Sequence, residues 1–330
     1  MPALSIILVN YRRPDDTVDC VRSLARSTFR DMQIIIVDNG SGDDSVDRLR
    51  RECPETTLIL SSRNLGFAGG NNLGIRRALD DGSSLILLLN NDTVVDPETL
   101  EALVRAIRAE PGTGIVGAKI VYHARPDILW FAGGYLNANA ARAGHHGIGE
   151  PDGTPFNTRK PCEYITGCCL LARREVFEAV GMLPVPYFAY MEDAEFCLRT
   201  RNAGYAVLYE PRARVLHKIS MTTRWDSPAY IYLNLRNRLL FLQRNSRPAL
   251  WAPHLPSLVY YYARQMIRLF IRGRGTPALR AAWYGIVDGL RGFTGEDGSG
   301  RLPMLPAADD AKPDVQVNTD GLSGTGPHCK

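Results

Sequence analysis

The stretch Leu85-Ile86-Leu87-Leu88-Leu89-Asn90-Asn91-Asp92 decides the fold, because five large apolar residues in a row are followed at once by three polar ones. An uninterrupted apolar run of this length is typical of a strand buried on both faces, as in a parallel sheet covered by helices. The polar residues would then stand at the carboxyl end of that strand, where open α/β sheets bind their ligands. The stretch therefore predicts a central strand with a functional end.

Similar runs alternate with helical patterns on both sides of this strand, which predicts an α/β fold with a mostly parallel central sheet. Expected strands are residues 4–10, 33–38, 57–60, 85–89, 115–120, 164–172 and 205–209. Expected helices are 16–27, 45–52, 71–79, 97–109 with Asp96 as its N-cap, 173–180 and 193–203. Residues 122–160 lack periodicity and predict a long loop or a small excursion over the edge of the sheet.

The bulk composition is that of an ordinary globular protein, with 330 residues of which 45% are hydrophobic and 22% charged. No run approaches the roughly eighteen apolar residues that span a bilayer, and the first residues lack the pattern of a secretory signal. The seven cysteines are irregularly spaced, which favours reduced thiols. A cytoplasmic protein is expected, possibly lying on the inner face of the cell membrane.

Positive charge is concentrated in one segment. Residues 224–291 hold eleven arginines, no lysine and two aspartates, a net charge of +9 in a chain whose total is +4. Such a segment favours a phosphate-bearing partner, and anionic lipid is expected rather than nucleic acid, because the rest of the chain is acidic.

A helix is expected at residues 257–271 within this segment. Its apolar positions are Leu258, Tyr262, Met266 and Leu269, and its arginines stand four apart at Arg264, Arg268 and Arg272. Two interpretations stay open: a helix lying on an anionic membrane, or a helix packed on the catalytic domain with its arginines in water.

The turn after the first strand reads Asn10-Tyr11-Arg12-Arg13-Pro14 and contains no glycine. It therefore lacks the G-x-G-x-x-G fingerprint of dinucleotide-binding dehydrogenases. Asp38 ends the next apolar run, where a carboxylate can accept a hydrogen bond from the N3–H of uracil or thymine. The alternative for Asp38 is a polar strand end that caps the following helix.

Two acidic motifs are candidates for chemistry. Asp92 could hold Mg²⁺ or Mn²⁺ beside substrate phosphates, although Asn90-Asn91-Asp92 would also build a plain turn. Glu192 and Asp193 open a helix, where the dipole favours acidic residues, and one of them could act as a general base. His217 follows an apolar run and could reach a metal or a phosphate, or be structural.

The stretch from Asn64 to Gly74 is dense in glycine and asparagine. Glycine permits close backbone approach, and a helix N-terminus offers free N–H groups to an anion. The alternative is a flexible turn.

In their order along the chain, these motifs resemble glycosyltransferase family 2, the inverting enzymes of GT-A fold, and more narrowly its rhamnosyltransferase-like bacterial branch. The resemblance covers about residues 1–245 and rests on residues 7–11, 36–41, 64–74, 89–93, 167–168 and 188–193, with His217 closing the series.

The resemblance implies that Asp38 contacts the nucleobase, that Asp92 with His217 binds a divalent metal (Mn²⁺ or Mg²⁺), and that Asp193 is the catalytic base supported by Glu192. The remaining implied nucleotide-sugar-binding residues are Asn10, Tyr11, Asn64, Gly66, Phe67, Gly70, Asn71, Asn90 and Asn91. Asn90 replaces the first acid of a D-x-D motif, and Thr223-Arg224-Trp225 lacks the glutamine of the processive members' motif.

The expected activity is single-displacement transfer of a sugar, with L-rhamnose as one candidate, from a dTDP- or UDP-linked donor. The acceptor would be a saccharide or a lipid-linked glycan in cell-surface glycan synthesis. Two alternatives stay open: a non-catalytic nucleotide-sugar-binding protein, and a sugar-1-phosphate nucleotidyltransferase, which would want a glycine-rich basic loop after the first strand.

The expected domain plan has three parts. A catalytic domain covers residues 1–245, with a nucleotide-sugar half at 1–121 and an acceptor half at 122–245. A basic helical extension covers 246–293, and the Gly-, Pro- and Asp-rich residues 294–330 predict a disordered tail.

Overall fold

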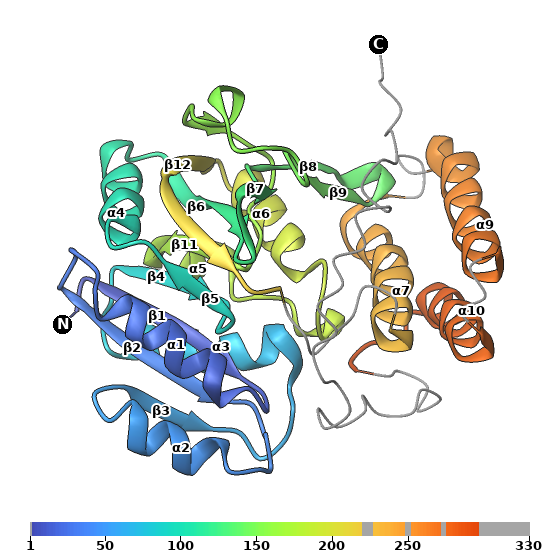
Figure 1. Ribbon diagram of the computed structural model, residues 1–330. Helices are drawn as coiled ribbons and strands as arrows, with labels where there is room; N and C mark the ends of the chain where they lie inside the picture. The colour runs from blue at the N-terminus through green and yellow to red at the C-terminus, as the bar shows by residue number, and fades with distance from the viewer. Residues whose placement is uncertain (1, 220–226, 248–251, 272–274, 297–330) are drawn as a thin grey trace.

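The computed structural model describes residues 2–219, 227–247, 252–271 and 275–296. Its core is a mixed sheet in the order β10-β12-β6-β11-β4-β1-β2-β3, with β5 paired to β12 and β7 paired to β6 (Figure 1). Strand β5 is Thr93–Val95 and β10 is Lys160–Pro161. The parallel part comprises β1 (Leu4–Asn10), β2 (Met32–Asp38), β3 (Thr57–Leu60) and β4 (Leu85–Leu89). The predicted α/β fold with a mostly parallel sheet is confirmed.

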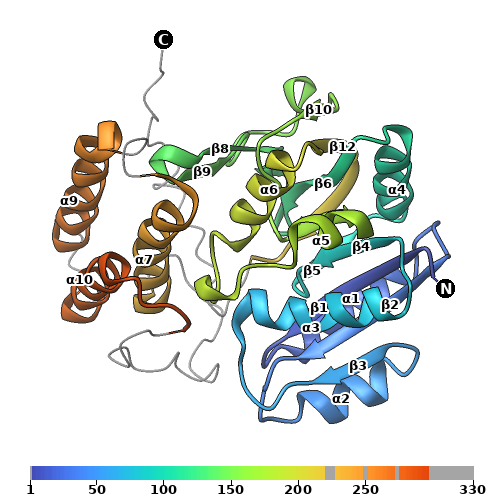
Figure 2. The same cartoon turned by 180° about the vertical axis from the view of Figure 1, so that it is seen from behind.

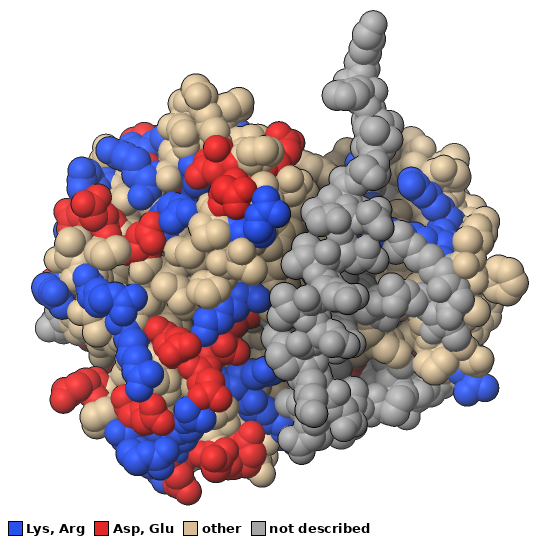
Figure 3. Space-filling model, in the orientation of Figure 1, with Lys and Arg blue, Asp and Glu red and all other residues tan. Residues whose placement is uncertain are grey.

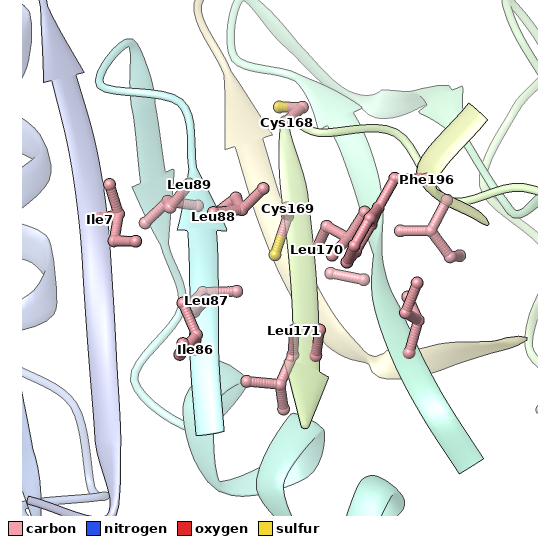
Figure 4. Packing of buried hydrophobic residues seen from close by; sticks show 14 of the residues in the cluster. Ile7, Ile86, Leu87, Leu88, Leu89, Cys168, Cys169, Leu170, Leu171 and Phe196 are labelled. Carbon is pink, nitrogen blue, oxygen red and sulfur yellow. The ribbon is translucent and has the colours of Figure 1, made fainter. Parts of the chain in front are cut away.

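Strand β4 is buried along its whole length, as its apolar run predicts. It pairs in parallel with β1 on one side and antiparallel with β11 (Cys169–Arg173) on the other. Figure 4 shows the leucines of β4 and β11 packed side by side in the core. Beyond β11 lie β6 (Thr113–Tyr122) and β12 (Ala206–His217), which are parallel to each other.

Helices cover both faces of the sheet. One face carries α1 (Pro14–Leu24) and α4 (Thr99–Ala109), and the opposite face carries α3 (Gly66–Asp80), α5 (Arg174–Val180) and α6 (Glu192–Asn202) (Figures 1 and 2). Helix α2 (Ser45–Glu52) lies beside β3.

The glycines of α3 bring this helix close to β1. A Cβ atom on Gly70 would lie 2.9 Å from Val9 Cγ1, and one on Gly74 would lie 2.5 Å from Ile7 Cγ2. Much of the glycine in the 64–74 stretch therefore serves helix–sheet packing.

Several details of the predicted secondary structure were wrong. The strand expected at 164–172 begins only at Cys169, and the strand expected at 205–209 runs from Ala206 to His217. Residues 122–160 contain β7 (Arg125–Phe131) and a hairpin of β8 (Gly134–Asn137) and β9 (Arg142–His145), because pairing between strands stabilises segments whose sequence lacks periodicity. The helix expected from residue 71 already begins at Gly66. The helix expected at 97–109 begins at Thr99, with Glu98 rather than Asp96 at the N-cap.

Three further helices stand beside the sheet: α7 (Pro228–Asn245), α9 (Leu255–Ile271) and α10 (Gly275–Arg291) (Figure 1). Helix α10 approaches the backbone of α7 closely, since a Cβ atom on Gly285 would lie 2.7 Å from the Tyr232 carbonyl oxygen. No helix in the described ranges has the length and apolar character needed to cross a bilayer.

The predicted domain boundary at residue 245 stays a prediction, although α7, on its catalytic side, packs against α10. Of the predicted disordered tail, residues 297–330 lie outside the described residues. The same holds for Arg272 and for the Thr223-Arg224-Trp225 segment.

Replacing Gly74 with alanine should destabilise the protein. Forcing a methyl group against Ile7 costs about 1–3 kcal/mol of unfolding free energy, which exceeds the roughly 1 kcal/mol that alanine gains in helix propensity. Urea unfolding of Gly74→Ala measures the loss. Gly112→Ala is the matched control, because a Cβ atom there meets nothing within 4 Å. Equal stability of the two variants would contradict the packing argument.

Candidate active site

Three polar strand ends meet at one edge of the sheet. The last residues of β1 and β2, Asn10 and Asp38, are register partners. In the neighbouring pair, Leu8 of β1 stands opposite Leu89 of β4. The residues after Leu89 therefore continue alongside Asn10, as expected for parallel strands that end together.

A line of hydrogen bonds joins these strand ends. The Asn91 amide donates to Thr17 Oγ1 (2.9 Å), whose hydroxyl donates to Asn10 Oδ1 (2.9 Å). The Asn10 amide in turn donates to Asp38 Oδ2 (2.8 Å). The predicted nucleobase contact and the loop that carries Asp92 are thus linked through α1.

Asp38 is anchored within the protein. Its Oδ2 accepts from the Ser41 hydroxyl (2.6 Å) as well as from Asn10, and its Oδ1 accepts from the Ser41 N–H (3.1 Å). Only 2% of the residue is exposed. A carboxylate oxygen has two lone pairs, so Oδ1 can still accept one more donor. Tyr11 is partly exposed at the same strand end, with the Arg12 guanidinium 5.2 Å from its ring centre.

Asn39 fixes the glycine-rich stretch. Its amide donates to Asn64 Oδ1 (2.9 Å) and to the Gly66 carbonyl (3.1 Å), and its Oδ1 accepts from the Leu65 N–H (3.0 Å). Gly66 has φ +72°, and a Cβ atom there would lie 2.3 Å from the Phe188 carbonyl oxygen. Glycine is therefore required where the turn around Phe188 meets α3.

The other predicted residues of this stretch also make internal contacts. The Phe67 ring lies against Gly167, where a Cβ atom would be 2.8 Å away. The Asn71 amide donates to the Phe67 carbonyl (2.9 Å), and Gly70 packs on Asn39. Their predicted contact with a nucleotide sugar stays a prediction.

Asp92 and His217 form a buried pair with free polar atoms. His217 Nε2 lies 3.2 Å from Asp92 Oδ1, although the two are not aligned for a hydrogen bond. Within the described residues, Asp92 Oδ2 and both ring nitrogens of His217 have no hydrogen-bond partner. Leaving such atoms buried and unpaired is costly, and a bound ligand would relieve that cost.

A carboxylate with an imidazole fits a divalent cation that takes its other ligands from substrate phosphates. The described ranges contain no group of three or more His, Cys, Asp or Glu placed to hold a metal alone. The backbone of Asn90 fixes the loop that carries Asp92. Its N–H donates to the Cys168 carbonyl (2.9 Å), and its carbonyl accepts from the Thr93 hydroxyl (2.6 Å).

Asp193 lies in the first turn of α6 and is held by donors from the loop before β11. Its Oδ2 accepts from the Tyr164 hydroxyl (3.0 Å) and from the Gly167 N–H (2.9 Å). Burial raises the pKa of Asp193 above its ordinary value, and these hydrogen bonds oppose the rise in part. The donors also fix the direction in which the carboxylate points.

Glu192, the neighbouring acid, is 4% exposed, and its Oε2 has no hydrogen-bond partner among the described residues. Burial and the charge of Asp193 raise the pKa of Glu192 to about 8. The pKa of both acids is raised, but only Asp193 has a side-chain donor as well as backbone donors that oppose the shift, so the proton of the pair favours Glu192.

The two acidic motifs lie on either side of Gly167 and Cys168. Gly167 donates to Asp193, while the carbonyl of Cys168 accepts from Asn90, two residues before Asp92. Burial raises the pKa of the Cys168 thiol, and the charges of Asp92 and Asp193 raise it further. The structure thus brings together acids that are about a hundred residues apart in the chain.

Several contributing residues were missed in the sequence. Thr17, Asn39 and Ser41 complete the hydrogen bonds of the strand ends, and Tyr164 reaches Asp193. Lys218 donates to carboxylates of α1 (2.9 and 3.0 Å). Asn39 and Ser41 lie within the motif at residues 36–41 but were given no role of their own. Only proximity to a motif could have pointed to Tyr164, and nothing local marks Thr17. In the described residues, all cysteines are free thiols, as predicted.

The Glu192→Gln variant should be more stable than the parent protein, increasingly so as pH rises from about 4.5 to 8. The folded protein keeps Glu192 protonated up to about pH 8, whereas the unfolded chain ionises near the ordinary value of 4.5. The parent protein therefore loses unfolding free energy through Glu192 as pH rises across this window, and Glu192→Gln does not. Melting temperatures at pH 5 and pH 8 measure the effect, and Glu175→Gln, at an exposed position of α5, is the control. A difference independent of pH would refute a protonated Glu192.

Comparison with known proteins agrees with this geometry. A family model described as Glycosyl transferase family 2 matches residues 5–181. The chain is 30% identical over 251 residues to the low-salt glycan biosynthesis hexosyltransferase Agl10 of Haloferax volcanii, covering 74% of this chain and 76% of that protein. It is 27% identical over 259 residues to the N-acetylglucosaminyl-diphospho-decaprenol L-rhamnosyltransferase of Mycobacterium tuberculosis (72% and 83%). It is also 26% identical over 270 residues to the dTDP-rhamnosyl transferase RfbF of Shigella flexneri (79% and 87%).

Among solved structures, the mannosyltransferase PcManGT of Pyrobaculum calidifontis, in complex with GDP-Man and Mn²⁺, shares the fold with a TM-score of 0.53 at 16% identity. That alignment covers 88% of this chain and 75% of the mannosyltransferase. The predicted resemblance to family 2 and its rhamnosyltransferase-like branch is confirmed, and it sets aside the nucleotidyltransferase alternative. The chain belongs to glycosyl transferase family 2 and is a glycosyltransferase of GT-A fold.

Proposed function

We propose that this enzyme transfers a sugar, L-rhamnose in the first instance, from a dTDP- or UDP-linked donor to a saccharide or lipid-linked acceptor, with inversion at the anomeric carbon. The observation that carries the proposal is Asp193, held by Tyr164 and Gly167 on one side of Cys168, with the Asp92–His217 pair on the other. Two relatives named as rhamnosyltransferases support the sugar, and the decaprenol-diphosphate in one of those names supports a lipid-linked acceptor.

Asp193 acts as the general base. Its carboxylate takes the proton of an acceptor hydroxyl while the hydroxyl oxygen forms a bond to the anomeric carbon. The bond between that carbon and the diphosphate oxygen breaks in the same displacement, and the nucleoside diphosphate departs. Glu192, protonated beside it, does not compete for the proton.

The donor binds at the carboxyl ends of β1, β2 and β4. Asp38 accepts a hydrogen bond from the N3–H of the pyrimidine ring. The other predicted nucleotide-sugar-binding residues lie between that ring and the diphosphate. Asp92 and His217 hold Mn²⁺ or Mg²⁺, which supplies positive charge for the departing diphosphate when bound. The unpaired Asp92 Oδ2 supports this role, as does the Mn²⁺ in the related mannosyltransferase structure.

Asp193→Asn should lower turnover at least a hundredfold, in line with general-base contributions of about 10²–10⁴. Release of dTDP from dTDP-L-rhamnose, with an N-acetylglucosaminyl-diphospho-lipid as acceptor, measures the rate. Nucleotide binding should persist, because the donor site is built from other strands. A thermal shift with dTDP or UDP and Mn²⁺ tests that and serves as the control for folding. Near-normal turnover of the variant would remove Asp193 from the mechanism.

Helix α9 supports a membrane-associated acceptor, though not through the face expected from the sequence. Tyr262, Met266 and Leu269 point inward and pack against the cluster that includes α7 and α10, and Leu258 is 4% exposed. That apolar face is therefore used for packing within the protein, as the second interpretation expected.

The opposite side of α9 is also apolar. Between 58% and 76% of each residue is exposed for a set that we call the α9 outer face: Val259, Tyr260, Ile267, Phe270 and Ile271. Arg264 and Arg268 are exposed beside it, and Figure 3 shows arginine and uncharged residues gathered over α9. The helix contains no acidic residue, and the single acid of α10, Asp288, is buried.

Exposed apolar residues flanked by arginines fit the interface of an anionic bilayer, where the former enter the acyl boundary and the latter meet phosphates. The enzyme is accordingly proposed to lie peripherally on the cytoplasmic face of the cell membrane, where a lipid-linked acceptor in that membrane can enter the active site.

Ile267→Ser combined with Phe270→Ser should abolish co-sedimentation with vesicles containing phosphatidylglycerol, because both side chains lie in the α9 outer face. Leu60→Ser is the matched control, since Leu60 is 50% exposed on β3, on the other side of the molecule. Arg264→Glu with Arg268→Glu should weaken binding to anionic vesicles at low salt. Binding that survives both double substitutions would leave α9 as a helix with a solvated arginine stripe.

A further inference from the structure

The turn that precedes Glu192 and Asp193 has a strained backbone. Phe188, Tyr190 and Met191 have φ of +66°, +71° and +80°, a region that residues with a Cβ atom rarely adopt. Phe188 has ψ −61°, and the Ala189 N–H donates to the Tyr187 carbonyl (2.8 Å), which makes a γ-turn of the rarer, strained kind. Such conformations persist only where the surrounding structure imposes them.

Asn237 of α7 supplies most of that constraint. Its amide nitrogen lies 3.0 Å from the carbonyl oxygen of Tyr187, 2.6 Å from that of Ala189 and 2.8 Å from that of Tyr190. Because the amide has two hydrogens, one of them is shared between two of these acceptors. Arg236 adds a donor to the Tyr187 carbonyl (2.9 Å). Both side chains are fully buried.

The one remaining carbonyl of the turn is also engaged. The Phe188 oxygen accepts from the Ala68 N–H of α3 (3.4 Å), at the place where Gly66 leaves room for it. All four carbonyls of residues 187–190 are therefore held from outside the turn.

The turn determines where Asp193 points. Met191, the last residue with positive φ, is the N-cap of α6, and Glu192 and Asp193 are its first two residues. The Asp193 carboxylate meets Tyr164 and Gly167 at hydrogen-bond distance only while α6 starts at this place and in this direction.

We propose that Asn237 is a positioning residue for catalysis, because its amide holds the strained turn and so sets the position of the Asp193 carboxylate. The proposal rests on the proposed function, in which Asp193 is the base. Asn237 lies on the last helix of the predicted acceptor half, and it acts through the backbone without touching the substrate.

A second contact of α7, this one with α6 itself, provides the matched control. Asn245 of α7 donates to Glu195 of α6 (2.9 Å), and Arg244 donates to both oxygens of that carboxylate (2.9 and 3.0 Å). This contact secures the first turn of α6 to α7, two residues beyond Asp193. Asn245 also donates to the Tyr187 hydroxyl (3.5 Å), but it leaves the carbonyls of the strained turn untouched.

Asn237→Ala and Asn245→Ala are compared with dTDP-L-rhamnose as donor and an N-acetylglucosaminyl-diphospho-lipid as acceptor. Asn237→Ala is expected to lower kcat at least tenfold while KM for the donor stays within twofold, because the strand ends that bind the donor are unchanged. Asn245→Ala is expected to lower the melting temperature with kcat within about twofold of the parent.

A fall in kcat no larger than that of Asn245→Ala, or an equal change in kcat and donor KM, would overturn the proposal. If Asn237→Ala does not fold, Asn237→Ser replaces it, since the hydroxyl keeps one donor and a smaller fall in kcat is expected. Asp193→Asn distinguishes a failure of the proposed function from a failure of the positioning role. If Asp193→Asn retains turnover, the proposed function itself fails. If it loses turnover while both Asn237 variants retain theirs, only the positioning role fails.

Discussion

The parallel pairing of β1, β2 and β4 is the constraint on which the rest of the structure depends. Because these strands run in the same direction with aligned ends, Asn10, Asp38 and the residues after Leu89 reach a common edge. Burial of β4 on both faces fixes this arrangement, since a shift in register would place apolar residues at that edge and polar residues in the core. Strand β11 runs antiparallel to β4 and begins at this same edge, so Gly167 and Cys168, the two residues before it, also lie there.

Most polar groups at this edge are bound to one another, and the exceptions are informative. Asn10, Asp38 and Asn91 are joined by internal hydrogen bonds, so they are preorganised for a ligand. Asp92 Oδ2, the two ring nitrogens of His217 and Glu192 Oε2 instead stay buried without hydrogen-bond partners in the described part of the chain. These unpaired atoms lower the stability of the fold at the places where a cation and a proton are expected to bind. Natural proteins commonly keep such unsatisfied polar groups at functional sites.

Helix α7 connects two parts of the molecule that the linear sequence separates. One side of it packs on α10, and its Asn237 holds the turn before α6. The α9 outer face belongs to the same group of helices through Tyr262, whose hydroxyl donates to the Leu235 carbonyl of α7 (3.0 Å). The C-terminal helices are thus part of the support of the proposed catalytic base as well as the proposed membrane contact.

The sheet, the strand ends and the family could be predicted from the sequence, because apolar runs and the polar residues that follow them are local patterns. Strands β1, β3 and β4 and helix α2 begin and end where those patterns predict. The folded chain was needed to place Asp92 and Asp193 on either side of Cys168, and to show that Tyr164 donates to Asp193 and that Asn237 donates to the turn before α6. It alone decided which side of α9 is buried. These outcomes depend on contacts between residues far apart in the chain, and no local spacing records which of two apolar helix faces meets a neighbour or which asparagine meets a strained turn.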